Sequence, residues 1–197
     1  MSKILLLIAL LSSEVFGADK EADFLIKKES QLLIHGESNV IDFTCMLKDA
    51  FDNTPFKMKG KEKRKKLYFN EGEIIVPTRN LDCGSRGMNQ DMWEMLQQKK
   101  YPNIILDFIE LQTPQWEKEE KSFSSSALSK IKITIAGIAR EYPIHLNLVK
   151  IDEENYQLSG SKKLRMTDFK IEPKHYLFGL IRVKDLIEID FQLFLTK

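Results

Sequence analysis

The side chains that could do chemistry are few and scattered in this sequence. It holds three histidines, His35, His145 and His175, and two cysteines, Cys45 and Cys83, none of them close to another. Protein zinc sites use closely spaced ligands such as Cys-x-x-Cys or His-x-x-x-His, and neither motif occurs. We therefore expect neither a metal centre nor a resident cofactor.

Catalytic motifs are equally hard to find. The sequence has no Gly-x-Ser-x-Gly elbow, no His-Glu-x-x-His and no glycine-rich phosphate loop. Asp168 and His145 are the only candidates for acid–base chemistry, and an aspartate in such a position more often braces a turn. We expect a protein that is not an enzyme.

The N-terminal residues have the layout of a secretory signal peptide. Lys3 precedes an apolar run from Ile4 to Leu11, and small residues follow before the charged mature chain. With Val15 and Gly17 at the −3 and −1 positions, we expect cleavage after Gly17, which leaves residues 18–197 as one domain. The apolar run is too short for a membrane span, which needs ~20 residues. The protein is therefore expected to be exported.

Export changes the interpretation of the two cysteines. An even number of cysteines outside the cytoplasm usually indicates a disulfide. We favour a Cys45–Cys83 bridge, and two buried free thiols remain the alternative.

Composition excludes several classes of protein. Lys and Arg number 30 against 29 Asp and Glu, so the basic excess typical of nucleic-acid-binding proteins is missing. The 43% apolar content is too high for a disordered chain. What remains is a folded domain of ordinary size.

Most of the chain alternates apolar and polar residues, which is the period of a half-buried strand. The alternation is clearest over 187–196, and it recurs over 131–135 and 144–148, with Gly137 between them for a hairpin turn. Further strands are predicted at 31–36, 39–47, 66–76, 103–111 and 155–166. Gly72 lies inside one of these runs and suggests a bulge. Eight to nine strands without a linker predict an all-β fold, one antiparallel sheet closed into a barrel.

One segment has helical periodicity. Met88, Met92, Met95 and Leu96 fall on one face of a short helix near 86–97, which Ser85 or Asn89 could cap. This face either packs against the barrel or lines the mouth of a ligand tunnel, because methionine adapts to irregular apolar shapes. The two roles are compatible.

A basic stretch stands out between two predicted strands. It contains Lys57, Lys59, Lys61, Lys63, Arg64, Lys65 and Lys66. We interpret it as a solvated hairpin loop, with docking on anionic lipid headgroups as the functional alternative. Nucleic-acid binding is not expected, because no aromatic residues interleave the lysines for base stacking.

Several segments, in order along the chain, resemble the YceI-like family. The resemblance spans nearly the whole mature chain and departs from the family at the basic stretch and after Pro173. It rests on residues 38–43, 76–84, 88–92, 101–104, 133–137 and 164–173, followed by Gly179 and Asp185.

Resemblance to this family implies a periplasmic protein with a lipocalin-like barrel that binds a polyisoprenoid, isoprenoid-quinone or other lipid chain. A barrel of about eight strands is just wide enough to hold one small ligand or to be filled by side chains. Our candidate pocket residues are Phe43, Phe69, Met88, Met92, Leu106, Phe108, Ile133, Ile135, Leu146, Phe169, Ile189 and Phe191.

Two other functions stay open beside the lipid-binding protein. The first is a stress-related or structural interaction module whose barrel is packed solid. The second is an enzyme that acts on a bound lipid through Asp168 or His145. Self-association as a homodimer is also left open.

Overall fold

The computed structural model describes residues 19–49, 51–52, 54–112 and 123–197. The expected signal peptide, residues 1–17, lies outside these described residues. Within them no helix is long and apolar enough to cross a membrane. The elements are β1 (Asp19–Ile26), β2 (Gln31–Ser38), β3 (Asp42–Leu47), β4 (Thr54–Lys63), β5 (Lys66–Glu71), β6 (Glu73–Pro77), η1 (Thr78–Asn80), β7 (Leu81–Asp82), α1 (Arg86–Met95), β8 (Asn103–Gln112), β9 (Phe123–Ile135), β10 (Ile138–Lys150), β11 (Asn155–Arg165), η2 (Met166–Phe169), β12 (His175–Tyr176), η3 (Leu177–Gly179) and β13 (Ile181–Thr196).

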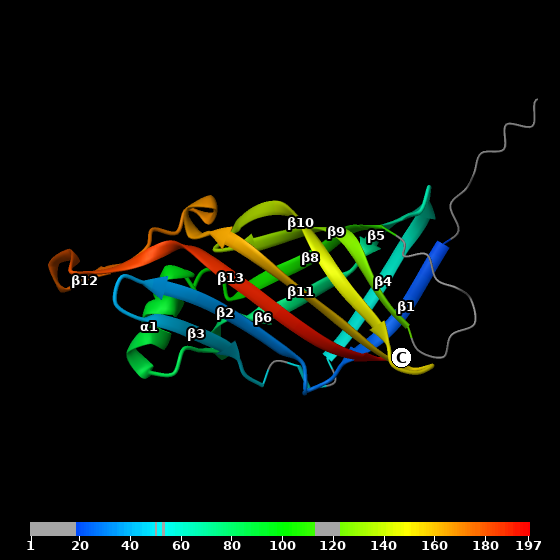
Figure 1. The fold of residues 1–197 in the computed structure, drawn as a ribbon, viewed down its shortest axis with the longest axis horizontal. Coiled ribbons are helices and arrows are strands. Elements are labelled where there is room, and N and C mark those ends of the chain that lie inside the picture. Colours follow the sequence, from blue (N-terminus) through cyan, green and yellow to red (C-terminus); the bar gives the residue numbers. More distant parts are fainter. Residues whose placement is uncertain (1–18, 50, 53, 113–122) are drawn as a thin grey trace, which may run out of the picture.

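The strands form one antiparallel sheet that closes on itself (Figure 1). Among the described residues, eight strands make the ring, in the order β1-β4-β5-β8-β9-β10-β11-β13. The ring closes where Leu25 and Ile26 of β1 pair with Thr196 and Leu195 of β13. Strands β2, β3 and β7 continue outward from β13, beside α1. The expected barrel of about eight strands is therefore confirmed.

The inward face of the barrel follows the predicted alternation. On β13, Ile189, Leu193 and Leu195 are buried, and Ile189 lies opposite Ile34 of β2. The predicted hairpin is present as β9 and β10, with Ala136 and Gly137 forming its two-residue turn at φ values of 48° and 76°. Positive φ at both positions is what a tight type I′ turn requires.

The predicted strand 66–76 is divided into two strands, and a bulge lies near Gly72 as predicted, because Lys59 pairs with Glu71 whereas Gly60 pairs with Phe69 and Asn70 is the extra residue. The chain leaves β5 at Glu71 and starts β6 at Glu73, and both strands pair with β8. Gly72 lies at the break, where its carbonyl accepts a hydrogen bond from the Phe108 amide at 2.9 Å. A second irregularity lies on the neighbouring strand β8, between Phe108 and Glu110.

The interpretation of the basic stretch as a loop is wrong. Residues 57–63 lie in β4, Arg64 and Lys65 form the turn at φ values of 52° and 60°, and Lys66 starts β5. Phe56 is fully buried and Met58 packs on the core, so the lysines at the alternate positions 57, 59, 61 and 63 occupy the outer face of a strand. The high density of lysines made the alternation of this strand hard to recognise in the sequence.

The acidic residues of neighbouring strands offset part of this charge. The Lys59 ammonium lies 3.7 Å from the Glu21 carboxylate, and that of Lys66 lies 3.0 Å from Glu110. Strand β1, which carries Glu21, was not predicted because charged residues dominate its first half. Both ion pairs lie on the exposed side of the sheet, where such pairs contribute little to stability.

The helix forms as predicted and Ser85 caps it. The Ser85 hydroxyl accepts a hydrogen bond from the Met88 amide at 3.3 Å. Asn89, the other candidate cap, instead accepts a hydrogen bond from the Cys83 amide at 2.6 Å and donates one to Asp82 at 3.0 Å. Hydrogen bonds from Lys48, Asn89 and the Gly84 amide lower the pKa of Asp82 to about 2. This network fixes the turn that leads into α1.

The Cys45–Cys83 disulfide is present, which confirms the predicted bridge. Cys45 is fully buried on β3, and Cys83 follows β7, the short strand that pairs with β3. The disulfide therefore ties the edge of the sheet to the start of α1. A tie of this kind stabilises a fold mainly by restricting the unfolded chain.

We expect the Cys45→Ser/Cys83→Ser variant to lose about 3–4 kcal/mol of stability, because the bridge closes a long loop. Urea unfolding measures this loss. A reducing agent should reproduce it in the wild type and leave the variant unchanged. A variant as stable as the oxidised wild type would contradict the structural role of the bridge.

Candidate functional site

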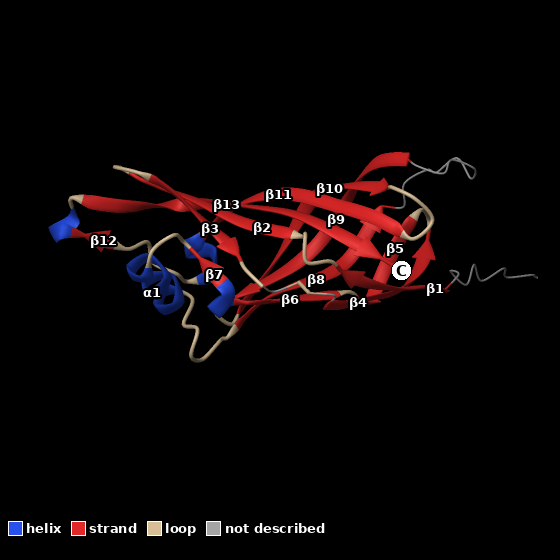
Figure 2. Ribbon diagram, turned by 90° about the horizontal axis from the view of Figure 1, so that it is seen from below, coloured by secondary structure: helices blue, strands red, loops and turns tan. Residues whose placement is uncertain are grey.

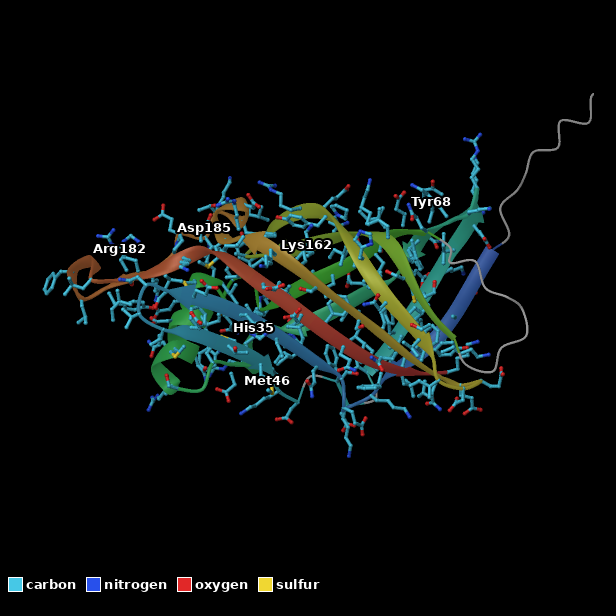
Figure 3. The ribbon with its side chains drawn as sticks, viewed as in Figure 1. His35, Met46, Tyr68, Lys162, Arg182 and Asp185 are labelled. Carbon is cyan, nitrogen blue, oxygen red and sulfur yellow. A yellow bond between two sulfur atoms is a disulfide. The ribbon has the colours of Figure 1, made fainter. Side chains whose placement is uncertain are left out.

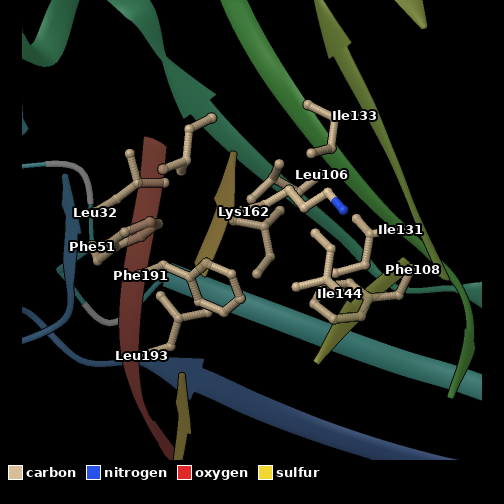
Figure 4. A pocket seen from close by; sticks show the side chains of 12 residues that line it. Leu32, Phe51, Leu106, Phe108, Ile131, Ile133, Ile144, Lys162, Phe191 and Leu193 are labelled. Atoms are coloured by element: carbon tan, nitrogen blue, oxygen red, sulfur yellow. The ribbon is translucent and has the colours of Figure 1, made fainter. Parts of the chain in front are cut away.

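The barrel interior contains an apolar cavity near its middle (Figure 4). Its volume is about 20 Å³. Lys162 is the one charged residue of its lining, and the other side chains are aliphatic or aromatic. The lining residues are Leu32, Phe51, Ile74, Leu106, Phe108, Ile131, Ile133, Ile144, Lys162, Ile189, Phe191 and Leu193.

A second apolar cavity lies beneath α1. Its volume is about 40 Å³, and three methionines, Met92, Met95 and Met166, are part of its wall. Ile189 lines both cavities, so the two spaces are neighbours across one side chain. The remaining lining residues are Ile34, Phe43, Leu96, Ile104, Ile135, Phe169, Ile171 and Ile187.

These volumes describe a closed interior. A space of about 10–15 Å³ holds one water molecule, so the cavities have room for only a few water-sized groups. A long chain could enter only if side chains moved apart. The methionines beneath α1 are the side chains best suited to such movement, since their unbranched thioethers change rotamer easily.

Nine of the twelve predicted pocket residues line one cavity or the other. Those on the first cavity are Leu106, Phe108, Ile133, Ile189 and Phe191, and those on the second are Phe43, Met92, Ile135, Phe169 and again Ile189.

Phe69, Met88 and Leu146 do not line either cavity. The Phe69 ring packs edge-on against Phe108, with 6.2 Å between centroids. Leu146 is almost fully buried, and Met88 packs partly buried at the start of α1. All three therefore pack in the core or against it, outside the lining of the two cavities.

Sequence patterns could have identified several residues that the prediction missed. Ile131, Ile144 and Leu193 continue the inward alternation of strands already recognised. Phe51 gave no such signal, because it lies between strands. Lys162 was missed because a charged residue on an inward position looks like a break in the pattern.

Gly160 shows how the wall accommodates a large ring. It lies between Leu146 of β10 and Phe191 of β13 in the strand register. A Cβ atom at this position would lie 2.8 Å from Cζ of Phe191, closer than such contacts occur. The glycine therefore allows the Phe191 ring to lie across the lumen, where it narrows the first cavity.

Lys162 lies at a seam in the barrel wall. Within residues 138–165, all of them described, backbone pairing between β10 and β11 stops at Leu146 and Gly160. Beyond that point, Nζ of Lys162 donates a hydrogen bond to the Pro143 carbonyl at 3.0 Å and lies 5.5 Å from the centre of the Tyr142 ring. Its alkyl stem lines the cavity while its ammonium group reaches the seam, as long basic side chains commonly do.

Asp168 also closes this seam. Its carboxylate accepts a hydrogen bond from the Tyr142 hydroxyl at 3.1 Å. Burial and this hydrogen bond raise the pKa of Tyr142 to about 12. Neither Asp168 nor His145 lines the two cavities, and His145 is exposed on β10. This removes the reason to assign either residue a role in lipid chemistry.

The histidines remain separate in the structure. His35, labelled in Figure 3, lies on the outer face with Nδ1 3.0 Å from the Thr44 hydroxyl and Nε2 3.1 Å from the Asp190 carboxylate. His175 is exposed on β12. Among the described residues no group of three or more His, Cys, Asp or Glu could hold a metal ion.

Burial of Tyr142 and its hydrogen bond to Asp168 together make a pH-dependent contribution to folding stability with a definite sign. The folded-state pKa of about 12 lies above the ordinary value of 10, so the contribution is complete below pH 10 and is lost as pH rises toward 12. In Asp168→Asn, we expect the pKa of Tyr142 to fall but to stay above 10, because burial persists. Ultraviolet titration of the phenols measures this, with Tyr142→Phe as the control that removes the signal. An unchanged titration in Asp168→Asn would contradict the contact.

No protein-family model matches the sequence. No curated protein matches it either. Solved structures that resemble the fold include three from different bacteria. A polyisoprenoid-binding domain from Saccharophagus degradans, implicated in plant cell wall breakdown, has 10% sequence identity and a TM-score of 0.63 over 90% of this chain and 99% of its own. BcnA from Burkholderia cenocepacia has 13% identity and a TM-score of 0.60 over 84% of this chain and 96% of its own. A YceI protein from Campylobacter jejuni has 15% identity and a TM-score of 0.48 over 66% of this chain and 73% of its own.

At such low identities the first two structures establish the fold and nothing more. Both align over nearly their whole length with most of this chain. The chain therefore has the lipocalin-like barrel fold that its resemblance to the YceI-like family implies.

Proposed function

We propose that this protein binds a single apolar chain, such as the isoprenoid tail of a lipid or quinone, inside its barrel. The observation that carries the proposal is the pair of apolar cavities that adjoin at Ile189. The shared fold with a domain described as polyisoprenoid-binding supports it. The protein acts in this proposal as a binding protein and not as an enzyme.

Binding must open the lumen, and the energetics allow this. Each methylene moved from water into an apolar interior contributes about 0.8 kcal/mol, so a few isoprene units offset the cost of displacing several side chains. The chain would enter most easily beneath α1, where Met92, Met95 and Met166 line the larger cavity. Selectivity would then depend on chain length and shape.

We also propose that the protein works outside the cytoplasm, in the periplasm. The signal-peptide layout of residues 1–17 and the Cys45–Cys83 disulfide support this location. If the chain is exported, the protein recovered from a periplasmic extract should begin at Ala18. An uncleaved protein that stays in the cytoplasm would contradict the proposal.

The small cavity volumes favour a second candidate, an interaction module with a packed barrel. The two candidates differ because only the lipid-binding protein would take up a lipid chain into its barrel. We expect organic-solvent extracts of the purified protein to contain a polyprenyl, quinone or acyl chain by mass spectrometry, and delipidated protein to take up added polyprenol. Empty extracts together with no uptake would overturn the lipid-binding proposal and support the packed module.

Ile189 allows a sharper test, because a larger side chain there would block the passage between the cavities. We expect Ile189→Phe to weaken binding of a long polyprenol at least about tenfold, at a stability cost of about 1–3 kcal/mol for overpacking. A short alcohol of about three isoprene units, which could lodge on the α1 side of Ile189 without passing this residue, should bind nearly as before.

Ile189→Leu is the matched control, since it conserves volume. Competition with a fluorescent polyene measures both affinities. Equal binding of the long chain by wild type and Ile189→Phe would show that the chain does not pass this residue.

A further inference from the structure

An apolar finger projects from one end of the barrel. We define it as residues 174–183, which contain β12, η3 and the start of β13. Figures 1 and 2 show it extending past α1, at the end opposite the C-terminus. At its tip, Leu177, Phe178 and Leu180 have exposed fractions of 63%, 110% and 72%. Such a concentration of exposed apolar side chains usually marks an interaction site.

The adjoining turn enlarges this apolar tip. Val40 and Ile41, between β2 and β3, are 62% and 58% exposed. Asn39 holds this turn against the finger by donating a hydrogen bond to the Leu180 carbonyl at 2.8 Å and accepting one from the Arg182 amide at 2.7 Å. The exposed residues therefore belong to one surface built from two segments far apart in sequence.

The polar side chains that join the finger to α1 lie at the base of the finger. Nζ of Lys174 lies 2.6 Å from the Asp91 carboxylate and 3.0 Å from that of Glu94, both on α1. The Tyr176 hydroxyl donates a hydrogen bond to Asp91 at 2.6 Å. Burial opposes ionisation of Asp91, but these hydrogen bonds outweigh it and lower its pKa. The base is thus fixed rigidly to α1 while the tip stays uncovered.

The charges around the finger are mostly paired. Lys174 is matched by Asp91 and Glu94, Lys184 forms an ion pair with Glu37, and Arg182 donates a hydrogen bond through Nε to the Gly179 carbonyl at 2.8 Å. An apolar apex above a polar, near-neutral base matches the gradient from hydrocarbon to headgroups in half a bilayer. Insertion of apolar side chains would therefore drive binding, with little help from charge.

The size of the tip argues against a second copy as its occupant. A stable protein interface uses about 20–30 residues on each side. The exposed tip offers Val40, Ile41, Leu177, Phe178 and Leu180 on a narrow projection. A soft bilayer can accept such a projection without a complementary pocket.

We propose that the apolar finger inserts into the surface of a lipid bilayer and brings the α1 end of the barrel to the membrane. The link between membrane docking and lipid cargo rests on the proposed lipid-binding function. Met92 and Met95 of α1 line the second cavity, so docking would bring this cavity to the membrane. The basic hairpin of β4 and β5, earlier considered for membrane contact, lies near the opposite end of the molecule, where Figure 3 shows Tyr68 far from Arg182.

Vesicle sedimentation of the purified protein tests the proposal. We expect binding to neutral phosphatidylcholine vesicles that persists in about 0.5 M salt, where surface charges are screened. Leu177→Ser/Phe178→Ser/Leu180→Ser should reduce this binding at least about tenfold, since it removes the apolar side chains that would leave water. The matched control, Lys63→Gln/Arg64→Gln/Lys65→Gln in the hairpin turn, should bind like the wild type.

Other results would overturn the proposal. Binding only to vesicles containing phosphatidylglycerol, lost in salt and in the hairpin variant, would assign the contact to the basic hairpin. An absence of vesicle binding would exclude a membrane role. If the wild type is a dimer and the finger variant is a monomer, the finger contacts a second copy of the chain instead of a membrane.

A fluorescence measurement keeps the test independent of the triple substitution. In Phe178→Trp, we expect the added tryptophan emission to shift to shorter wavelength with phosphatidylcholine vesicles, and an unshifted spectrum would contradict insertion. Lipid extraction of the finger variant separates the two proposals. If the finger variant retains lipid cargo but does not bind vesicles, the finger acts in docking alone. If the wild type binds vesicles but never holds cargo, the proposed membrane insertion is supported and the proposed lipid-binding function is contradicted.

Discussion

Strand β13 is the element on which the rest of the structure depends. One of its edges pairs with β11 from Leu186 to Thr196, and its other edge pairs first with β2 and then with β1. This double use of one edge closes the ring and still leaves β2, β3 and β7 to extend the wall toward α1. Closure satisfies the backbone hydrogen bonds that an open sheet would expose. It also turns one face of every strand toward a common interior.

The lumen follows from that closure. Side chains that alternate along each strand must meet at the barrel axis, so their sizes decide how much space remains. Phe191, for which Gly160 leaves room, narrows the first cavity, while three methionines form part of the wall of the larger cavity beneath α1. The interior is therefore nearly filled, and its side chains can rearrange more easily beneath α1 than around Phe191. A lumen of this kind can be closed without cargo and widened by it, because thioether side chains repack at little cost.

The two ends of the barrel differ in the chemistry that they present. The β4–β5 hairpin carries lysines that neighbouring glutamates partly offset. The opposite end carries α1, the larger cavity and the apolar finger, joined by the contacts of Lys174 and Tyr176 with Asp91. The basic hairpin thus lies away from the end where the apolar finger and the larger cavity come close together.

The sequence by itself determined the strands with an apolar inner face, the β9–β10 hairpin, the helix with its methionine face and the pairing of two cysteines, because each depends on local periodicity or on a count. The prediction of a loop at residues 57–66 was wrong, because outward lysines concealed a strand whose inner face is marked by the buried Phe56. Tertiary structure alone decided which inward residues line a cavity, how Lys162 reaches the seam and where the finger projects. Those features depend on register and strand spacing, and these arise only when segments far apart in the chain are brought together by closure of the barrel.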